Sequence, residues 1–276
     1  MDKSNYFIEN KAIFGVFPSQ EDIYELENNG VCYFLDLTIN FEPGTERYIT
    51  QKNYENYPIQ DRGIPTDTIS YTMLILKYAN IIKGLSNNKK VYIHCRGGHG
   101  RSGMVAACLL VFINKINAYD AMHITSKYHS ERSVITEKWR KLGSPQSKIQ
   151  RNFVSTFFRP FYMFIGLYYQ KTPYFGFCKS ILEIYNNVII ELSKDNNGEN
   201  IKDYDVINSL EKYENLCDKL YRKILDFFID NIRARDQLLK TGLSKLIFNY
   251  SILYKVTISD SLEQIRLKFY NEMLMM

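Results

Sequence analysis

The segment "HCRGGHGRSG", residues 94–103, contains side chains that could attack and hold a phosphate group. Cys95 supplies a thiol, and Arg101 follows after five residues, three of which are glycines. An arginine fork can bind two oxygens of a tetrahedral phosphate. Glycines let the backbone curl closely around an anion. A thiol in such a cationic, N–H-rich loop is expected to ionise to a thiolate nucleophile at neutral pH.

The chain on both sides of this segment has the pattern needed to position these groups. The stretch "KVYIH" before it reads as a short strand, and the apolar run "MVAACLLVFI" predicts a buried helix over residues 102–115. A strand, a glycine-rich loop and a helix together turn backbone N–H groups and the helix dipole toward one point, which favours an anion. The Gly-Lys-Ser/Thr ending of a nucleotide P-loop is absent, so this is not that motif.

The rest of the N-terminal half alternates between strand and helix patterns. "AIFGVF" could be an edge strand, "VCYFLDL" is a β-branched and aromatic strand, and "YENYPI" is a weaker one. Ser19 is placed to cap the helix "QEDIYELENN", and Gly30 to end it. A longer helix is predicted over residues 66–86, with a buried stripe of Leu74, Tyr78, Ile81 and Leu85. The alternation predicts an α/β fold with a largely parallel sheet.

Composition and charge indicate the cellular compartment of the protein and the kind of partner that it binds. The five cysteines form no Cys-x-x-Cys pair, which favours reduced thiols in a cytoplasmic protein. No signal-peptide pattern is present, and the longest apolar run, residues 104–113, is too short to span a bilayer, so no stable membrane insertion is expected. Residues 56–159 carry 16 basic and 5 acidic side chains, which predicts an anionic partner, with a solvated lysine surface as the alternative.

The same residues carry a resemblance to a known family. "HCRGGHGRSG" resembles the signature His-Cys-x-x-Gly-x-x-Arg-Ser/Thr of cysteine-dependent protein tyrosine and dual-specificity phosphatases at every fixed position. "GVFPSQEDIYELENNGVCYFLDLT" and "YPIQDRGIP" are similar to the smaller dual-specificity type, particularly the kinase-associated and the bacterial or viral kinds, and "GSPQSKIQRNFV" is similar to the ending of some of these enzymes. The resemblance covers roughly residues 10–158. It implies a three-layer fold with a central, largely parallel twisted sheet flanked by helices.

The resemblance also implies a role for each signature residue. Cys95 would attack phosphorus and carry a phosphocysteine intermediate, and Ser102 would steady the thiolate and ease its departure. His94 would support the loop structurally rather than transfer a proton. The phosphate oxygens would be held by the loop residues Arg96, Gly97, Gly98, His99, Gly100 and Arg101.

A leaving oxygen also needs an acid, which the family supplies from a mobile loop before the signature. The position of Asp61 in "PIQDRGIP" predicts that role, with Gly63 as a hinge residue. Asp67 is the competitor, but it lies where a helix N-terminus uses an acidic side chain. Gln146 or Gln150 could position the hydrolytic water, although a surface glutamine at a helix start fits equally well. No cofactor is implied, and the four histidines are not spaced as a metal-ligand set.

Several substrate classes remain open to such an enzyme. No aromatic recognition loop is evident in residues 1–55, which predicts a shallow dual-specificity pocket and phosphoprotein substrates, both phosphotyrosine and phosphoserine/threonine. Phosphoinositides or RNA 5′ ends are the alternatives. Arg96 and His99 occupy the places where tensin-homologue lipid phosphatases carry basic residues, although an unperturbed histidine is mostly neutral above pH ~6.5. A pseudophosphatase that binds phosphate without turnover is the remaining alternative.

The chain after residue 158 has a different pattern. Aromatic and apolar segments alternate with a polar stretch, "KDNNGENIKD", and "VINSLEKYENLCDKLYRKILDFFIDNI" has helical periodicity. We therefore expect a catalytic domain over residues 1–158 and a mostly helical region of unknown function over residues 159–276.

Overall fold

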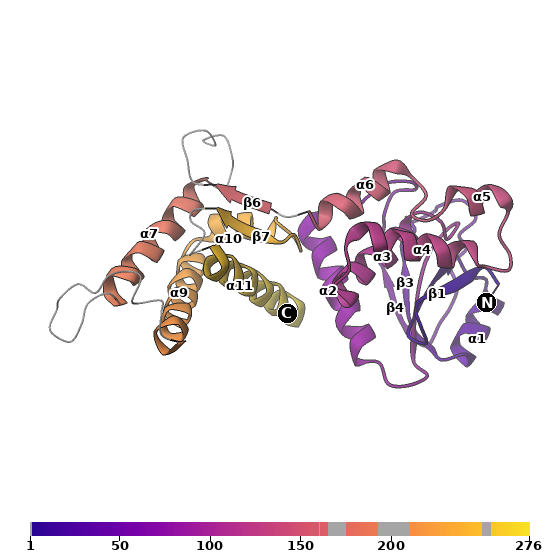
Figure 1. The fold of residues 1–276 in the computed structure, drawn as a ribbon. Coiled ribbons are helices and arrows are strands. Elements are labelled where there is room, and N and C mark those ends of the chain that lie inside the picture. Colours follow the sequence, from indigo (N-terminus) through magenta and orange to yellow (C-terminus); the bar gives the residue numbers. More distant parts are fainter. Residues whose placement is uncertain (1, 160, 165–174, 193–209, 250–254) are drawn as a thin grey trace. The chain divides into compact units, whose positions relative to one another are not determined.

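The structure is a computed structural model that describes residues 2–159, 161–164, 175–192, 210–249 and 255–276 (Figure 1). The chain divides into two compact units, Met1–Phe158 and Arg159–Met276.

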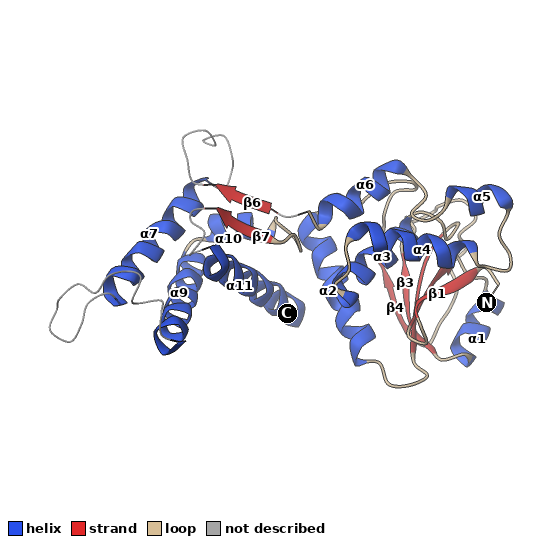
Figure 2. Cartoon of the chain, in the orientation of Figure 1, coloured by secondary structure: helices blue, strands red, loops and turns tan. Residues whose placement is uncertain are grey.

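A five-stranded sheet forms the centre of the first unit (Figure 2). Its strands are β1 (Ser4–Ile8), β2 (Ala12–Val16), β3 (Val31–Asp36), β4 (Asn53–Asn56) and β5 (Lys90–Cys95), in the spatial order β1-β2-β5-β3-β4. All neighbouring strands pair in parallel except β1 and β2, which are antiparallel. Because parallel strands end at the same edge, Val16 and Asp36 lie in register with Cys95 and His94.

Six helices flank this sheet: α1 (Gln20–Asn28), α2 (Thr68–Gly84), α3 (Arg101–Asn114), α4 (Ala118–Ser130), α5 (Glu137–Leu142) and α6 (Lys148–Phe157). Alternate residues of a strand face opposite sides of a sheet. On one side, Ile13, Phe34 and Tyr92 pack against Ile23 and Leu26 of α1. On the other side α3 contacts β2 and β5 and is enclosed by α2, α4 and α6. This layered α/β arrangement confirms the predicted fold class.

Local signals placed most of these elements correctly. Ser19 caps α1 in a capping box with Asp22, as its position predicts. The run "AIFGVF" is not an edge strand, however, because Ser4–Ile8 pairs with Ala12–Val16 and forms the edge itself. In α2 the stripe is rotated by one residue late in the helix, so that Ile82 is fully buried while Ile81 is only half-buried.

In the second unit, helices dominate the described residues. They are α7 (Phe175–Leu192), α9 (Leu210–Asp230), α10 (Ile232–Leu239) and α11 (Lys255–Met275), with a parallel pair of short strands, β6 (Phe161–Phe164) and β7 (Leu246–Asn249). The core of this unit includes Ile181, Leu220, Phe228, Leu262 and Ile265. A mostly helical C-terminal region was expected, whereas the strand pair was not. Within the described ranges, the helices are all too short or too polar to cross a bilayer.

Candidate active site

The glycine-rich loop joins the end of β5 at Cys95 to the start of α3 at Arg101. Its carbonyl groups are bound by neighbouring elements. The Phe17 N–H donates to the carbonyl of Arg96 at 3.2 Å. The buried Arg132 guanidinium donates to the carbonyl of Gly98 at 2.9 Å, and the Ser144 hydroxyl donates to that of His99 at 2.7 Å. These bonds hold the carbonyls away from the pocket, which is what an anion-binding loop requires.

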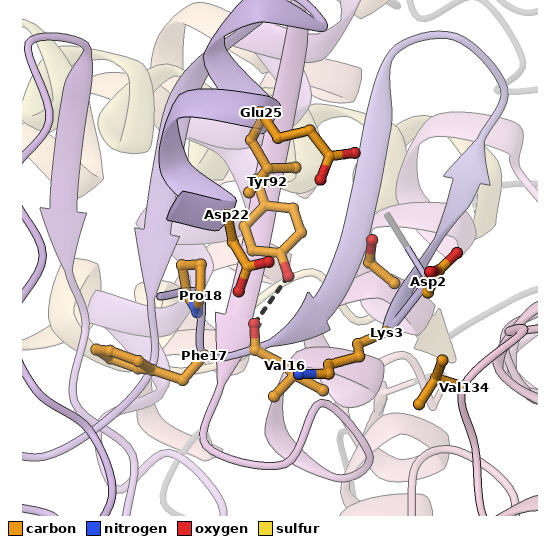
Figure 3. Close-up of a pocket in the computed structure, with 11 residues that line it drawn as sticks. Asp2, Lys3, Val16, Phe17, Pro18, Asp22, Glu25, Tyr92 and Val134 are labelled. Atoms are coloured by element: carbon orange, nitrogen blue, oxygen red, sulfur yellow. Dashed lines mark hydrogen bonds between the residues drawn. The ribbon is translucent and has the colours of Figure 1, made fainter. Parts of the chain in front are cut away.

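One glycine of the loop has a conformation that other residues rarely adopt. Gly98 has a φ of +69°, and a Cβ built there would lie 2.6 Å from the carbonyl carbon of Gly15 in β2. The end of β2 is itself held in place, because the Tyr92 hydroxyl donates to the carbonyl of Val16 at 2.8 Å (Figure 3). The loop therefore packs directly on a strand end whose position is fixed by β5.

The nucleophile candidate lies at the base of a pocket. Cys95 is 3% exposed, and its Sγ lies 3.5 Å from the hydroxyl of the fully buried Ser102. The pocket brings together most of the residues that the sequence singled out, with two that it did not: Arg62 and Trp139. Its lining is Asp61, Arg62, Cys95, Arg96, Gly97, His99, Gly100, Arg101, Trp139 and Gln146.

Arg101 is almost completely buried and is held by a carboxylate that the sequence did not reveal. Its two terminal nitrogens donate to the two carboxylate oxygens of Glu42 at 2.7 and 2.6 Å, and Nη1 also donates to the carbonyl of Ile59 at 2.9 Å. Burial opposes ionisation of Glu42, but the hydrogen bonds and positive charge of Arg101 outweigh it and lower the pKa of Glu42. A buried guanidinium needs such a partner, yet no local pattern shows which distant acid supplies it.

Asp61 reaches the same guanidinium from the other side. One of its carboxylate oxygens accepts from Nη2 of Arg101 at 3.1 Å, and the other lies 3.4 Å from Nη2 of Arg96. Its side chain remains 40% exposed. Asp67, the competitor, instead caps α2, where its carboxylate accepts from the N–H of Ile69 at 2.9 Å. Asp61 therefore lies in the pocket beside two arginines, whereas Asp67 caps a helix.

His94 is fully buried behind the loop and is not among the residues that line this pocket. Its Nε2 is 2.7 Å from the Tyr48 hydroxyl, and its Nδ1 is 3.7 Å from Asp36. Burial lowers the pKa of His94 to about 4, although the charge of Asp36 opposes the shift. The ring is neutral at pH 7 and packs edge-on against Phe17.

The two remaining basic side chains of the loop differ from their expected states. Burial and then the charge of Arg132 lower the pKa of His99 to about 4, so His99 does not become cationic near pH 6.5 as an unperturbed histidine would. Arg96 is drawn toward Asp61 and toward Glu42, whose carboxylate lies 3.7 Å from its Nε.

The two candidate glutamines, Gln146 and Gln150, lie in different environments. Gln150 is fully buried rather than at the surface, because it completes the capping box of α6 and donates to the carbonyl of Gly63 at 3.1 Å. Its amide packs against Gly100, where a Cβ would lie 2.8 Å from Oε1. Gln150 therefore joins the hinge at Gly63 to the glycine-rich loop, and Gln146 alone of the two lines the pocket.

Comparison with known proteins shows which family the chain is similar to. The family described as the Swiss Army Knife protein, DSP-PTPase phosphatase domain, matches residues 14–153. Protein 067L of Invertebrate iridescent virus 3, which carries a tyrosine-phosphatase name, is 36% identical over 174 residues, or 62% of this chain and 72% of the relative. Protein 197R of Invertebrate iridescent virus 6, similarly named, is 40% identical over 152 residues, covering 54% of this chain and about half (52%) of the relative. A phosphatidylglycerophosphate phosphatase of Arabidopsis thaliana is 25% identical over 159 residues, covering 54% of this chain and 67% of the relative.

Proposed function

The chain belongs to the tyrosine and dual-specificity phosphatase family and contains a protein phosphatase domain, and on that premise we propose that it hydrolyses phosphomonoesters of phosphoproteins through a phosphocysteine intermediate. The observation that carries the proposal is the single pocket that holds Cys95, Arg101 and Asp61 together.

In the first step the Cys95 thiolate attacks phosphorus. The S–P bond forms as the P–O bond to the substrate breaks, and Asp61 gives its proton to the departing oxygen. The N–H groups of the loop and Arg101 hold the equatorial oxygens, whose charge is best matched in the transition state. The Asp61 carboxylate accepts a hydrogen bond from Arg101 at 3.1 Å. A bound phosphoryl group would replace this carboxylate at the guanidinium, and the released Asp61 side chain would turn toward the leaving oxygen.

In the second step water attacks the phosphocysteine. The Asp61 carboxylate takes a proton from this water, the O–P bond forms, and the S–P bond breaks to release phosphate and the thiolate. Ser102, 3.5 Å from Sγ, donates a hydrogen bond that stabilises the departing thiolate. Gln146 is the pocket amide available to orient the water, and Gln150 is committed to Gly63 and to its own helix cap.

The charges around the pocket favour phosphoproteins over phosphoinositides. A ring with several phosphates needs several free cations beside the reacting one, but Arg96 already lies between two carboxylates, which leaves Arg62 as the other lining arginine besides Arg101. His99 adds no charge at pH 7, because burial keeps it neutral. The names of the viral relatives support phosphotyrosine as one substrate. The plant relative's name makes a lipid phosphate the second candidate.

Turnover on a substrate panel tests the proposal. The panel contains phosphotyrosine and phosphothreonine peptides, phosphoinositides, phosphatidylglycerophosphate and 5′-triphosphate RNA. We expect the highest kcat/KM on a phosphopeptide, and complete loss of hydrolysis with retained binding in Cys95→Ser, because a serine hydroxyl stays protonated there. A higher kcat/KM on a lipid or RNA phosphate would contradict the substrate class. Tight binding with no turnover by the unmodified chain would identify a pseudophosphatase.

A pair of aspartate variants tests the acid. Asp61→Asn should lower kcat by roughly 10²–10⁴-fold on alkyl phosphates and much less on aryl phosphates, whose leaving group needs little protonation. The alkaline limb of the pH–rate profile should disappear with it. Asp67→Asn is the matched control. It should keep turnover, since asparagine still caps a helix. The reverse result would assign the acid to Asp67.

We further propose residues 1–158 as the catalytic domain, because every pocket residue lies within them. The free state of all five cysteines supports a reducing compartment such as the cytoplasm.

A further inference from the structure

The fourth residue after Cys95, His99, is enclosed by two side chains outside the phosphatase motif. Its ring stacks on Trp139 of α5, with centroids 4.4 Å apart and planes inclined by 16°. Its Nδ1 lies 2.8 Å from Nε2 of His129, near the C-terminal end of α4. His129 is fully buried. These two rings therefore fix the position and the rotation of His99.

The other edge of the His99 ring faces the loop. A Cβ built on Gly97 would lie 3.0 Å from Cδ2 and 3.5 Å from Nε2 of His99. Both residues line the catalytic pocket. Nδ1 of His99 therefore faces the buried His129, and Nε2 is the ring nitrogen on the side where substrate binds.

The hydrogen bond between the two rings allows two proton arrangements. If Nδ1 of His99 donates, the proton of His129 must sit on its own Nδ1, which is buried without a hydrogen-bond partner in the described structure. If Nε2 of His129 donates, that buried Nδ1 is only a bare lone pair, and the proton of His99 sits on Nε2. An orphaned buried N–H is rarer than an unsatisfied acceptor. The second arrangement is therefore favoured.

Burial, and then the positive charges around the pair, keep both rings neutral. Arg132, in the segment after α4, and Arg140 of α5 place positive charge beside them. Arg62, Arg96 and Arg101 line the pocket on the substrate side, and Asp61 is the carboxylate among the lining residues. Burial, and then the charges of Arg132, His99 and Arg140, lower the pKa of His129 to about 3. The pair therefore carries one proton per ring at pH 7.

We propose that His129 is a positioning residue that holds His99 in the Nε2–H tautomer. His99 then donates a hydrogen bond from this Nε2–H group to an oxygen of the bound substrate. The inference rests on the proposed function and deepens it. A neutral donor adds one hydrogen bond without adding charge, so it suits a monoester with an acceptor oxygen beside the loop. That oxygen belongs to the phosphoryl group or to a peptide carbonyl.

The tautomer can be read directly in the unmodified chain. The sequence contains four histidines, so a protein labelled with ¹⁵N-histidine gives only four ring systems in long-range ¹H–¹⁵N spectra. Spectra of His99→Phe and of His123→Leu assign two of them. We expect His99 to carry its proton on Nε2 at pH 7 and to stay neutral down to pH 5. A proton on Nδ1, or a cationic ring at pH 7, would overturn the proposal.

Kinetics test whether the donor contacts substrate. His129→Leu removes the partner, and His129→Gln restores an N–H at the place of Nε2. We expect kcat/KM to fall about 3- to 10-fold in the first, as for one neutral hydrogen bond, and to recover in the second. His123→Leu, an exposed position on the same helix, is the control. Unchanged kcat/KM in both His129→Leu and His99→Phe would contradict the donor role.

Two substrates locate the acceptor. A loss on both an aryl phosphate and a phosphotyrosine peptide places it on the phosphoryl group, and a loss on the peptide alone places it on the peptide. Peptide affinity of Cys95→Ser, with and without His129→Leu, makes the same comparison without turnover. An inactive chain whose peptide affinity depends on His129 would contradict the proposed function alone, whereas an active chain with the Nδ1–H tautomer would contradict this inference alone.

Discussion

Arg101 shows how a single buried charge links binding to stability. Its guanidinium is 1% exposed and makes a two-point bond with the buried Glu42 carboxylate. Removing one member of such a pair leaves an uncompensated buried charge, which costs several kcal/mol. Glu42 thus holds Arg101 at a fixed angle before any substrate arrives, and the position of Arg101 depends on the long connection after β3.

We predict that Glu42→Gln lowers kcat about 10- to 100-fold and the free energy of unfolding by about 3 kcal/mol. The amide keeps the shape of the carboxylate but supplies one acceptor and no charge. Steady-state kinetics and urea denaturation measure the two effects. Glu46→Gln, at an exposed site in the same connection, is the control and should change stability by less than ~0.5 kcal/mol. A wild-type kcat in Glu42→Gln would show that Glu42 is not needed to position Arg101 for catalysis.

At the scale of elements, the loop depends on the contact between β2 and β5. Gly98 lies against the backbone of Gly15 and Val16, so the loop cannot move any closer to the end of β2. The Arg132 guanidinium reinforces the contact by donating both to Gly98 and to the carbonyl of Phe14 at 3.0 Å. One guanidinium thereby joins the loop to β2.

Gly98→Ala should lower kcat/KM about 100-fold, because the backbone of β2 is too close for a methyl group and the loop must shift. The left-handed backbone at this position adds roughly 1–2 kcal/mol of strain. Gly84→Ala is the matched control, since no atom lies within 4 Å of a Cβ there and the residue ends α2. We expect the control to keep full activity. Equal activity in the two variants would show that the loop tolerates the shift.

These contacts also explain which features could be predicted from sequence. The strand–loop–helix around Cys95, the cap at Ser19 and the cap at Asp67 depend on neighbours within a few residues, so local patterns identify them. The partnership of Arg101 with Glu42 spans 59 positions and depends on how a connection folds back. The neutral state of His99 depends on burial against another helix, which a loop motif cannot show. The edge strand Ser4–Ile8 was missed because it is short and mixes polar with aromatic residues.

At the scale of the whole molecule, the histidines are unevenly divided between the two units. All four histidines lie in residues 1–158, as does the one tryptophan, Trp139. Three of these histidines, at positions 94, 99 and 129, have pKa values lowered mainly by burial. The second unit contains no histidine. Mild acid should therefore act on the two units differently.

We predict that lowering the pH from 6.5 to 5 destabilises the first unit selectively. A histidine whose folded pKa is about 4 binds fewer protons when folded than when unfolded, so its contribution to stability is complete above pH 6.5 and declines as the pH falls toward 4. His94 alone should cost about 2 kcal/mol by pH 5, at roughly 1.4 kcal/mol per pH unit. Glu42 does not contribute in this range, because its stabilisation declines only below its unfolded pKa of 4.5.

Urea denaturation at pH 7, 6 and 5 separates the two units. Trp139 fluorescence reports the first unit alone, and far-ultraviolet circular dichroism reports the helices of both. The fluorescence midpoint should fall with pH, while the transition that the dichroism alone detects should stay in place. His94→Gln should reduce the pH dependence of the first midpoint, because an amide has no proton to gain. Parallel shifts of both transitions, or none between pH 7 and 5, would show that the buried histidines do not control acid stability.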